Sequence, residues 1–252
     1  MKSDYKEDQH PKRSTYRDKR RQETIRAIMD GAKKRLEETP TLALSLRSVA
    51  DLIGMAPSAV YRYFASREAL ITALCVDSYN SLADYIELSL NQDEADHKTA
   101  GVAGMAVTDW KTLSRSYRQW SLHHPAEFAL LFGPPQSNEV TDTEATIKAA
   151  RRFGDIGLQI FAKGIESGEI ILSGDAANNL TAVSKSFSDS ILAATLKEPT
   201  TLPIGLILSG WACIHGVVCL EVFGFLSTMV INTEVFFEEH LNRTMEWMGF
   251  RI

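Results

Sequence analysis

Cysteine is scarce in this chain of 252 residues, which contains only Cys75, Cys213 and Cys219. An odd and sparse set cannot build the disulfide framework that stabilises many small secreted domains. It suits a reducing cytoplasm, where we expect the protein to reside. Cys213 and Cys219 fall on different faces of one expected helix, and no His or Cys pattern has the spacing of a metal site. The sequence therefore predicts neither a metal nor another cofactor.

The chain also lacks the apolar segment of a secretory signal, because residues 1–21 are polar and charged throughout. One run of 17 residues without charge, 204–220, approaches the lower limit for a membrane-spanning helix. It contains Ser209 and His215, ends at Glu221, and lacks the flanking Lys and Arg residues that orient a span. We therefore expect a buried helix and no membrane partner.

Motifs of the common enzyme classes are missing as well. There is no phosphate loop, dinucleotide-binding glycine pattern, zincin motif or Gly-x-Ser-x-Gly elbow. Gly154, Gly157 and Gly164 are closely spaced, but they lie on a helical pattern with no strand before them. No alternating strand pattern recurs at the spacing a sheet needs. The sequence predicts an all-α protein that is not an enzyme.

Charge is present in ordinary amount but is unevenly distributed. The formal net charge is −5, which is unusual for a nucleic-acid binder. Residues 1–70 hold 15 Lys and Arg against 10 Asp and Glu, a balance of +5, whereas residues 71–252 hold 12 against 22, a balance of −10. Opposite signs indicate a small basic module joined to a larger acidic one. A phosphate-bearing partner is expected at the basic module.

The basic module predicts three short helices around a small core. Apolar residues at offsets 0, 3, 4, 7 and 11 from Ile25 predict a helix over 20–38. Ser45 can cap a second helix, Gly54 ends it, and Pro57 suits the first turn of a third helix that extends to Phe64. Two short helices with a glycine-containing turn between them are typical of a helix-turn-helix. We assign residues 20–66 to a DNA-binding domain.

The third helix would be the recognition helix. Because Val60 and Phe64 face inward, the side chains between them are available to a DNA groove. Arg62 could pair with guanine, and Ala59 or Tyr61 could touch a thymine methyl group. The alternatives are that Tyr61 packs inside the three-helix unit and that Arg62 is only solvated. The expected DNA-binding residues, phosphate contacts included, are Ser45, Arg47, Ser58, Ala59, Tyr61, Arg62, Tyr63 and Arg67.

Residues 1–19 show no apolar periodicity and are expected to form a flexible arm. A dense cationic run crosses its end: Lys12, Arg13, Arg17, Lys19, Arg20 and Arg21. Such an arm can reach along or into a DNA groove. The alternative is a solvated tail without a DNA contact.

The remainder of the chain, residues 67–252, predicts a larger helical bundle for ligand binding and dimerisation. Apolar periodicity predicts helices over 67–91, 102–123, 126–132, 143–167, 175–197, 203–229 and 233–248. Aromatic residues at helical spacing fit either a core or an apolar cavity between helices. The expected lining is Trp110, Tyr117, Trp120, Phe128, Phe132 and His124, with His123 and Arg118 as further polar groups.

A family resemblance covers about residues 20–75. The stretch from Ser45 to Leu70, including Gly54, the run Tyr61-Arg62-Tyr63-Phe64 and the helix start Ser66-Arg67-Glu68-Ala69-Leu70, resembles the DNA-binding segment of the tetracycline-repressor (TetR) family. Departures are modest. Ala56 stands where the family usually has a capping Ser or Thr, Tyr63 replaces a frequent His, and Arg67 replaces a frequent Lys.

A second resemblance lies in the apolar run. Trp211, His215, Gly216 and Glu221 are spaced as in the Trp…His-Gly…Glu helix of one branch of this family. The two resemblances imply a homodimer whose C-terminal domain commonly binds a small molecule and thereby releases an operator on double-stranded DNA. Because one short helix reads too few base pairs, we expect a palindromic operator with two half-sites about one helical turn, or a multiple of it, apart. The alternative is a helical adaptor or small-molecule-binding protein without operator-specific binding.

The dimer interface is expected on the two most apolar late helices, 175–197 and 203–229. Two helices from each protomer would pack as a four-helix arrangement. Small residues on the second helix allow close approach, and Trp211 and His215 share a face. The expected interface residues are Gly205, Ser209, Trp211, Ala212, His215 and Gly216.

Overall fold

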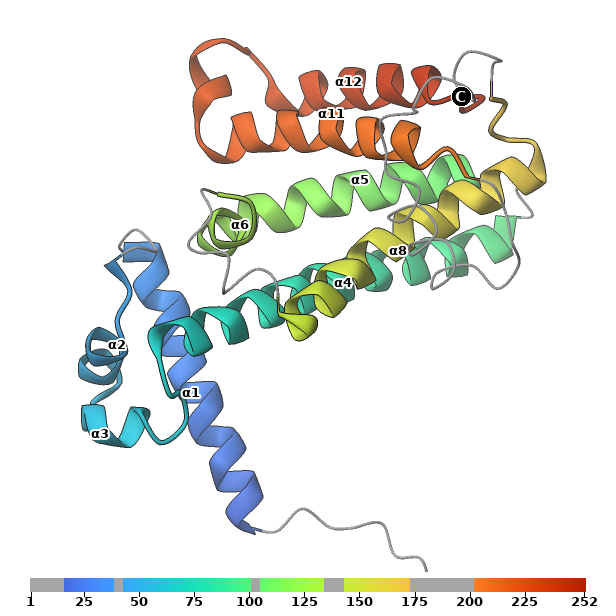
Figure 1. The fold of residues 1–252 in the computed structure, drawn as a ribbon. Coiled ribbons are helices and arrows are strands. Elements are labelled where there is room, and N and C mark those ends of the chain that lie inside the picture. Colours follow the sequence, from blue (N-terminus) through green and yellow to red (C-terminus); the bar gives the residue numbers. More distant parts are fainter. Residues whose placement is uncertain (1–15, 39–42, 101–104, 134–142, 173–201) are drawn as a thin grey trace, which may run out of the picture. The chain divides into compact units, whose positions relative to one another are not determined.

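The computed structural model describes residues 16–38, 43–100, 105–133, 143–172 and 202–252. This part of the chain is helical, with one isolated antiparallel bridge between Ile170 and Phe250 (Figure 1), so the predicted all-α class is confirmed. The chain divides into two compact units, one reaching Leu74 and the other beginning at Cys75. The predicted limits of the domains, 20–66 and 67–252, stay predictions.

The first unit is built around a helix-turn-helix. Its elements are α1 (Tyr16–Glu38), α2 (Leu46–Ile53), α3 (Pro57–Val60) and the first turns of α4 (Arg67–Ala100). Ser45 and Ser48 form a capping box at the start of α2, each hydroxyl accepting the other residue's backbone N–H. Gly54 ends α2 in the left-handed conformation, with φ of 68°. Local sequence signals therefore account for both ends of α2.

Apolar residues from all four helices make the core of this unit. Fully or nearly fully buried side chains are Ile28, Ala32 and Leu36 of α1, Leu46, Val49 and Ala50 of α2, then Val60, Phe64 and Leu70. Gly31 lets α1 approach α2, because a Cβ atom there would collide with the Ile53 side chain. The predicted inward orientation of Val60 and Phe64 is confirmed.

Two boundaries differ from prediction in this unit. The helix α1 begins at Tyr16, so Arg17 and Lys19 lie on a helix and not in the expected flexible arm. The α-helical part of α3 ends at Val60, whereas the prediction extended it to Phe64. The backbone nevertheless keeps turning, because the N–H groups of Tyr63 and Phe64 both donate to the carbonyl of Val60.

The second unit is a helical bundle. Besides α4 it contains α5 (Met105–His123), α6 (Pro125–Phe132), α8 (Glu144–Ser167), α11 (Ile204–Val222), the short 3-10 helix η2 (Phe225–Thr228) and α12 (Thr233–Trp247). The helix α5 packs against α8 on one side and α11 on another, and α11 packs against α12 (Figure 1). The predicted helix over 175–197 lies outside the described residues.

The uncharged run forms α11, but the predicted continuous helix to residue 229 is wrong. Gly224, with φ of 78°, ends the helical path after Val222, and a 3-10 turn follows. Among the described helices, only α11 is long and apolar enough to cross a membrane. Its contacts explain this composition otherwise, because Ile214, Val217 and Val218 are buried and Gly210 lies against Met248, the residue that follows α12. The run behaves as the core helix that we predicted.

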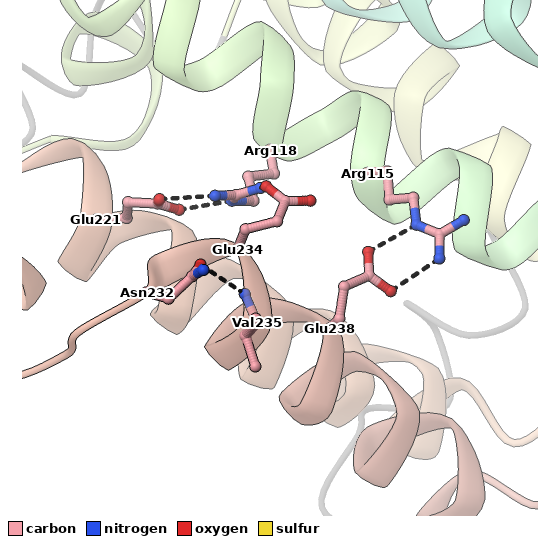
Figure 2. A network of polar contacts seen from close by, with 7 residues as sticks. All are labelled: Arg115, Arg118, Glu221, Asn232, Glu234, Val235 and Glu238. Atoms are coloured by element: carbon pink, nitrogen blue, oxygen red, sulfur yellow. Dashed lines mark hydrogen bonds and ion pairs between the residues drawn. The ribbon is translucent and has the colours of Figure 1, made fainter.

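A network of ion pairs joins α5 to α11 and α12 (Figure 2). The Arg118 guanidinium donates two hydrogen bonds to the Glu221 carboxylate, at 2.7 and 2.8 Å, and one to Glu234. The Arg118 and Glu221 side chains are only 8% and 9% exposed. Arg118 is thus a structural partner of Glu221, and the suggestion that it lines a ligand cavity is wrong.

A second, more exposed pair lies on the same face. Arg115 makes a two-pronged contact with Glu238 of α12, at 2.7 and 2.8 Å, but its side chain is 47% exposed. The hydrogen bonds from Arg118 hold the pKa of Glu221 below its usual range although burial acts in the opposite direction. Because one ion pair is buried and the other is exposed to solvent, substitutions of the two arginines compare the stability contributions of a buried and an exposed pair.

We predict that Arg118→Met lowers the free energy of unfolding by about 3 kcal/mol or more, because it leaves the Glu221 carboxylate buried without a cation. Arg115→Met should cost about 1 kcal/mol or less, as exposed ion pairs do. Urea denaturation at pH 7 measures both. Equal losses in the two variants would contradict the assigned importance of burial.

The same pair predicts a pH dependence. The depressed pKa of Glu221 contributes stability that is present above the unfolded-state pKa of about 4.3 and is lost as the pH falls through the lower folded-state value. Arg118→Met lacks this contribution. The stability difference between wild type and variant should therefore narrow as the pH is lowered from 7 to below 4, in urea titrations at each pH.

Candidate nucleic-acid interface and ligand cavity

The turn between α2 and α3 positions the recognition helix. After Gly54, the Met55 N–H donates to the carbonyl of Ala50 at 2.9 Å. Ala56 occupies the N-cap of α3 and, as its lack of a hydroxyl predicts, makes no side-chain capping bond. Pro57 takes the first helical position, where its missing N–H is not needed. The start of α3 therefore depends on backbone geometry and on Pro57.

The side chains predicted to face DNA lie at the surface. Ser58, Tyr61 and Arg62 are exposed, and Ala59 and Tyr63 are half-buried. Tyr61 is 54% exposed, which argues against the alternative that it packs inside the unit. A single short segment thus presents hydroxyl, aromatic and guanidinium groups together, while Val60 and Phe64 anchor it from below.

Among the expected phosphate contacts, the structure distinguishes exposed residues from those with structural roles. Arg47 is exposed, whereas Ser45 caps α2. The Arg67 Nε atom donates to the carbonyl of Leu44 at 2.8 Å, and its guanidinium lies 3.8 Å from the Glu68 carboxylate. Arg67 therefore ties the start of α4 to the chain just before α2. A phosphate contact by Arg67 stays a prediction.

The cationic part of α1 meets the end of the recognition segment. The Arg21 guanidinium lies over the Tyr63 ring, 5.5 Å from its centroid. Four predicted cationic residues are exposed on α1, namely Arg17, Lys19, Arg20 and Arg21, while Lys12 and Arg13 lie outside the described residues. The contact between Arg21 and Tyr63 brings two separately predicted groups of DNA-binding residues into one surface.

A cavity of about 310 Å³ lies in the second unit, among α4, α5, α8 and α11. Three of the six predicted lining residues border it, namely Trp110, Tyr117 and Phe132. The Tyr117 ring stacks on Phe153 with centroids 5.4 Å apart. None of its described lining residues carries a charge. The space is therefore aromatic and apolar.

The other predicted lining residues lie elsewhere, which corrects those assignments. Trp120 and Phe128 are buried in the core, and the Trp120 indole N–H donates to the Ser81 hydroxyl at 3.1 Å. His124 occupies the N-cap of α6 and lies 3.6 Å from the Glu127 carboxylate. Neither His124 nor His123 lines the cavity. Helical spacing indicated which residues share a face, but not which neighbour that face meets.

The predicted interface residues Trp211 and His215 face the interior of their own protomer. Trp211 lines the cavity and stacks on the His215 ring at 4.7 Å. His215 Nδ1 lies 2.6 Å from the Tyr117 hydroxyl and Nε2 lies 3.2 Å from Cys219 Sγ. These contacts lie within one protomer, and a place for the two rings at a dimer interface stays a prediction.

The remaining interface candidates are small residues at different depths. Gly205 is buried, Ser209 and Gly216 are half-buried, and Ala212 is exposed. Leu208 and Leu220, which the prediction did not include, are 39% and 41% exposed. Leu208, Ala212, Gly216 and Leu220 are four residues apart and so share one face of α11.

Several cavity residues escaped the sequence prediction. Gly154 and Gly157 of α8 border the space, together with Ile204, Ile207 and Ile214 of α11. The close spacing of glycines in a helical pattern is the sequence signal for the α8 wall of this cavity. Across the described ranges, no group of three His, Cys, Asp or Glu residues is close enough to hold a metal ion.

Comparison with known proteins identifies the class. Residues 28–74 match the family described as "Bacterial regulatory proteins, tetR family", and residues 110–244 match "Tetracyclin repressor-like, C-terminal domain". The HTH-type transcriptional regulator Rv1816 of Mycobacterium tuberculosis is 32% identical over 197 residues, which is 78% of this chain and 80% of that protein. These matches define a DNA-binding transcriptional regulator of the helix-turn-helix class.

Solved structures share the fold of this chain. The crystal structure of the regulatory protein SCO4313 is 25% identical in sequence and has a TM-score of 0.64, and the match covers 92% of this chain and 100% of that one. A TetR family transcription regulator from Marinobacter aquaeolei VT8, 15% identical, shares the fold with a TM-score of 0.57, covering 92% and 99%. The chain belongs to the tetracycline-repressor (TetR) family, as its N-terminal motif predicted. The Trp…His-Gly…Glu branch stays a prediction.

His215 adds a titratable group beside the cavity. Burial lowers the pKa of His215 from its usual value of 6.5, and burial also raises the pKa of the Tyr117 phenol. A neutral imidazole with its proton on Nε2 satisfies both contacts, since the phenol then donates to Nδ1 and Nε2 donates to Cys219. The folded protein therefore keeps His215 neutral where the unfolded chain binds a proton.

We predict that this difference destabilises the protein in mild acid. A lowered folded-state pKa means that the His215 contribution is present above pH 6.5 and is lost as the pH falls towards the folded-state value. His215→Gln should show a shallower loss of unfolding free energy between pH 7.5 and 5.5 than wild type. His123→Gln, which replaces an exposed ring, should follow wild type. Parallel curves for His215→Gln and wild type would contradict this assignment.

Proposed function

We propose that this regulator is a cytoplasmic bacterial homodimer that represses transcription from a palindromic operator and is released by a small, largely apolar molecule. The observation that carries the proposal is the uncharged cavity of about 310 Å³ in a chain that also carries an exposed recognition segment. Such a volume lies at the low end of the range for small-molecule sites.

The DNA contact rests on charge and exposure. Exposed cations on α1 are suited to phosphates, which dominate affinity without reading sequence. Arg62 and Tyr61 are exposed on the recognition segment and are suited to base edges in the major groove. The acidic balance of residues 71–252 repels the duplex, so the basic surface is the favoured side of approach.

We propose dimerisation because one short recognition helix contacts too few base pairs to specify a single operator. Two half-sites about one helical turn apart, or a multiple of it, supply the missing specificity. The exposed face of α11 formed by Leu208, Ala212, Gly216 and Leu220 offers a partly apolar surface with small residues at its centre. An identical face on a second protomer would give an isologous interface.

Release by a ligand requires that the ligand bind the DNA-incompetent form better than the competent one. A coupling free energy of about 1–3 kcal/mol weakens operator binding roughly 5- to 150-fold. The helix α4 is continuous from Arg67 to Ala100, and Tyr79 on it borders the cavity. We propose that α4 transmits the ligand's effect by changing the separation of the two recognition helices.

The DNA contact is tested with sequences selected from random DNA. Arg62→Ala should weaken binding to the selected operator by about 1–3 kcal/mol and relax the preference at one base pair. Arg21→Ala should weaken binding to all sequences alike and reduce the salt slope by about 1. Arg243→Ala, which removes an exposed cation from α12, is the control and should change neither.

Gel-shift titrations at several salt concentrations give these values. Failure to select any sequence, with no shift at low salt, would support the alternative of an adaptor without operator-specific binding.

The proposed dimer interface is tested by introducing a large, charged side chain at its centre. Ala212→Arg should convert a dimer of 28.0 kDa chains into monomers, since the new side chain enters the proposed contact with its own copy. Ala145→Arg makes the same change at an exposed position of α8 and should leave the dimer intact. Sedimentation velocity distinguishes these states, and a wild-type monomer would exclude the proposed assembly.

A further inference from the structure

Two glycines of α8 border the cavity without a structural reason to be glycine. Neither Gly154 nor Gly157 has a positive φ. A Cβ atom added at Gly154 would meet no atom of the described residues within 4 Å. One added at Gly157 would make ordinary contacts with Trp110 at 3.8 Å and Leu113 at 4.0 Å. Backbone conformation and packing therefore both permit alanine at these positions.

A third glycine of the same helix shows the contrast. At Gly164 a Cβ atom would collide with the Ile170 side chain, so close packing requires glycine there. A glycine inside a helix lowers its stability by about 1 kcal/mol relative to alanine. Gly154 and Gly157 carry that cost without a packing gain. Their effect is to leave space in the cavity wall.

The second observation concerns hydrogen-bond donors. Trp110 and Trp211 both line the cavity, and among the described residues neither indole N–H has a hydrogen-bond partner although both are buried. Trp110 is only 4% exposed. A buried donor without a partner costs about 1–3 kcal/mol. Because each nitrogen has almost no accessible surface, these donors lie behind the cavity wall, and the surface that meets a ligand is aromatic and apolar.

Charge limits the ligand further. The nearby Arg118 is paired with Glu221, and no described lining residue is charged. A charged ligand would lose its hydration here without gaining a counter-charge. Gly154 borders the cavity and is also exposed, so the described part of the cavity reaches the protein surface at α8.

We propose that the cavity takes a neutral, ring-containing molecule, and that Gly154 and Gly157 provide the space for its ring. This inference rests on the proposed ligand-controlled function and specifies its ligand class. Aromatic faces of Trp110, Tyr117 and Trp211 would hold the ring. The glycines would act as size-determining residues for the ligand.

The test uses prodan, a neutral naphthyl ketone whose fluorescence rises in apolar surroundings. Wild-type protein should bind prodan, acetylnaphthalene should displace it, and naphthoate, of similar size but anionic, should not. Displacement by naphthoate as effective as by acetylnaphthalene would overturn the neutral-ligand assignment. Absence of prodan binding to wild-type protein would overturn the proposal.

Filling the space tests the glycines. Gly157→Leu should weaken prodan binding about tenfold or more. Gly154→Leu is the second variant, with the same expected loss, and it replaces Gly157→Leu in the test if that variant does not fold. Gln159→Leu introduces the same side chain at an exposed position of α8 that does not border the cavity, and should bind as wild type. Unchanged binding in a folded leucine variant at either glycine would overturn their assigned role.

Operator binding separates this inference from the proposed function. The selected operator should still be shifted by Gly157→Leu, because the substitution lies outside the helix-turn-helix. Prodan binding without any operator binding by wild-type protein would leave the ligand class standing and overturn the DNA-binding proposal. Operator binding by wild-type protein, without a prodan site that depends on the glycines, would leave the DNA-binding proposal standing and overturn the proposed ligand class.

Discussion

The cavity depends on how α5 lies against α11, and the buried ion pair between Arg118 and Glu221 holds that arrangement. The pair orients both helices because two parallel hydrogen bonds allow little sliding or rotation. One residue earlier on α5, Tyr117 reaches His215 at 2.6 Å. The ring of His215 in turn stacks on Trp211, which lines the cavity. Polar contacts at one end of the helix pair thus place aromatic groups along the rest of it.

The cavity wall formed by α8 differs from the wall formed by α5 in the size of its side chains. On α5 the cavity is bounded by large rings, whereas on α8 it is bounded partly by glycine. Large side chains on both walls would fill the space between the helices, as they do at Phe161, which is fully buried. Gly157 faces Trp110 and Leu113 across the cavity, and Gly154 also borders it, so this wall leaves space that larger side chains would occupy. Its uncharged lining belongs to the acidic part of the chain, whereas the helix-turn-helix belongs to the basic part, so the overall charge of −5 is the sum of two modules of opposite sign.

Local signals predict the helix ends of the first unit correctly. Ser45, Gly54 and Pro57 mark helix ends through their own backbone chemistry, and all three lie at the ends they predicted. Apolar periodicity predicts the ends of long apolar segments less accurately. Gly224 ended α11 earlier than predicted because its positive φ redirects the chain, and a periodicity count does not register that change. Trp211 and His215 shared a face as predicted, yet that face meets α5 of the same protomer.

The sequence by itself determined the helical class, the helix-turn-helix with its exposed Tyr61 and Arg62, and the separation of basic from acidic modules. These depend on residues close together in the chain, on helical period and on composition. Only the tertiary structure decided that Arg118 pairs with Glu221, that Arg21 stacks on Tyr63, and that two glycines and two tryptophans border one cavity. Those contacts join residues that are distant in sequence, and their partners are set by packing between helices, which periodicity does not specify.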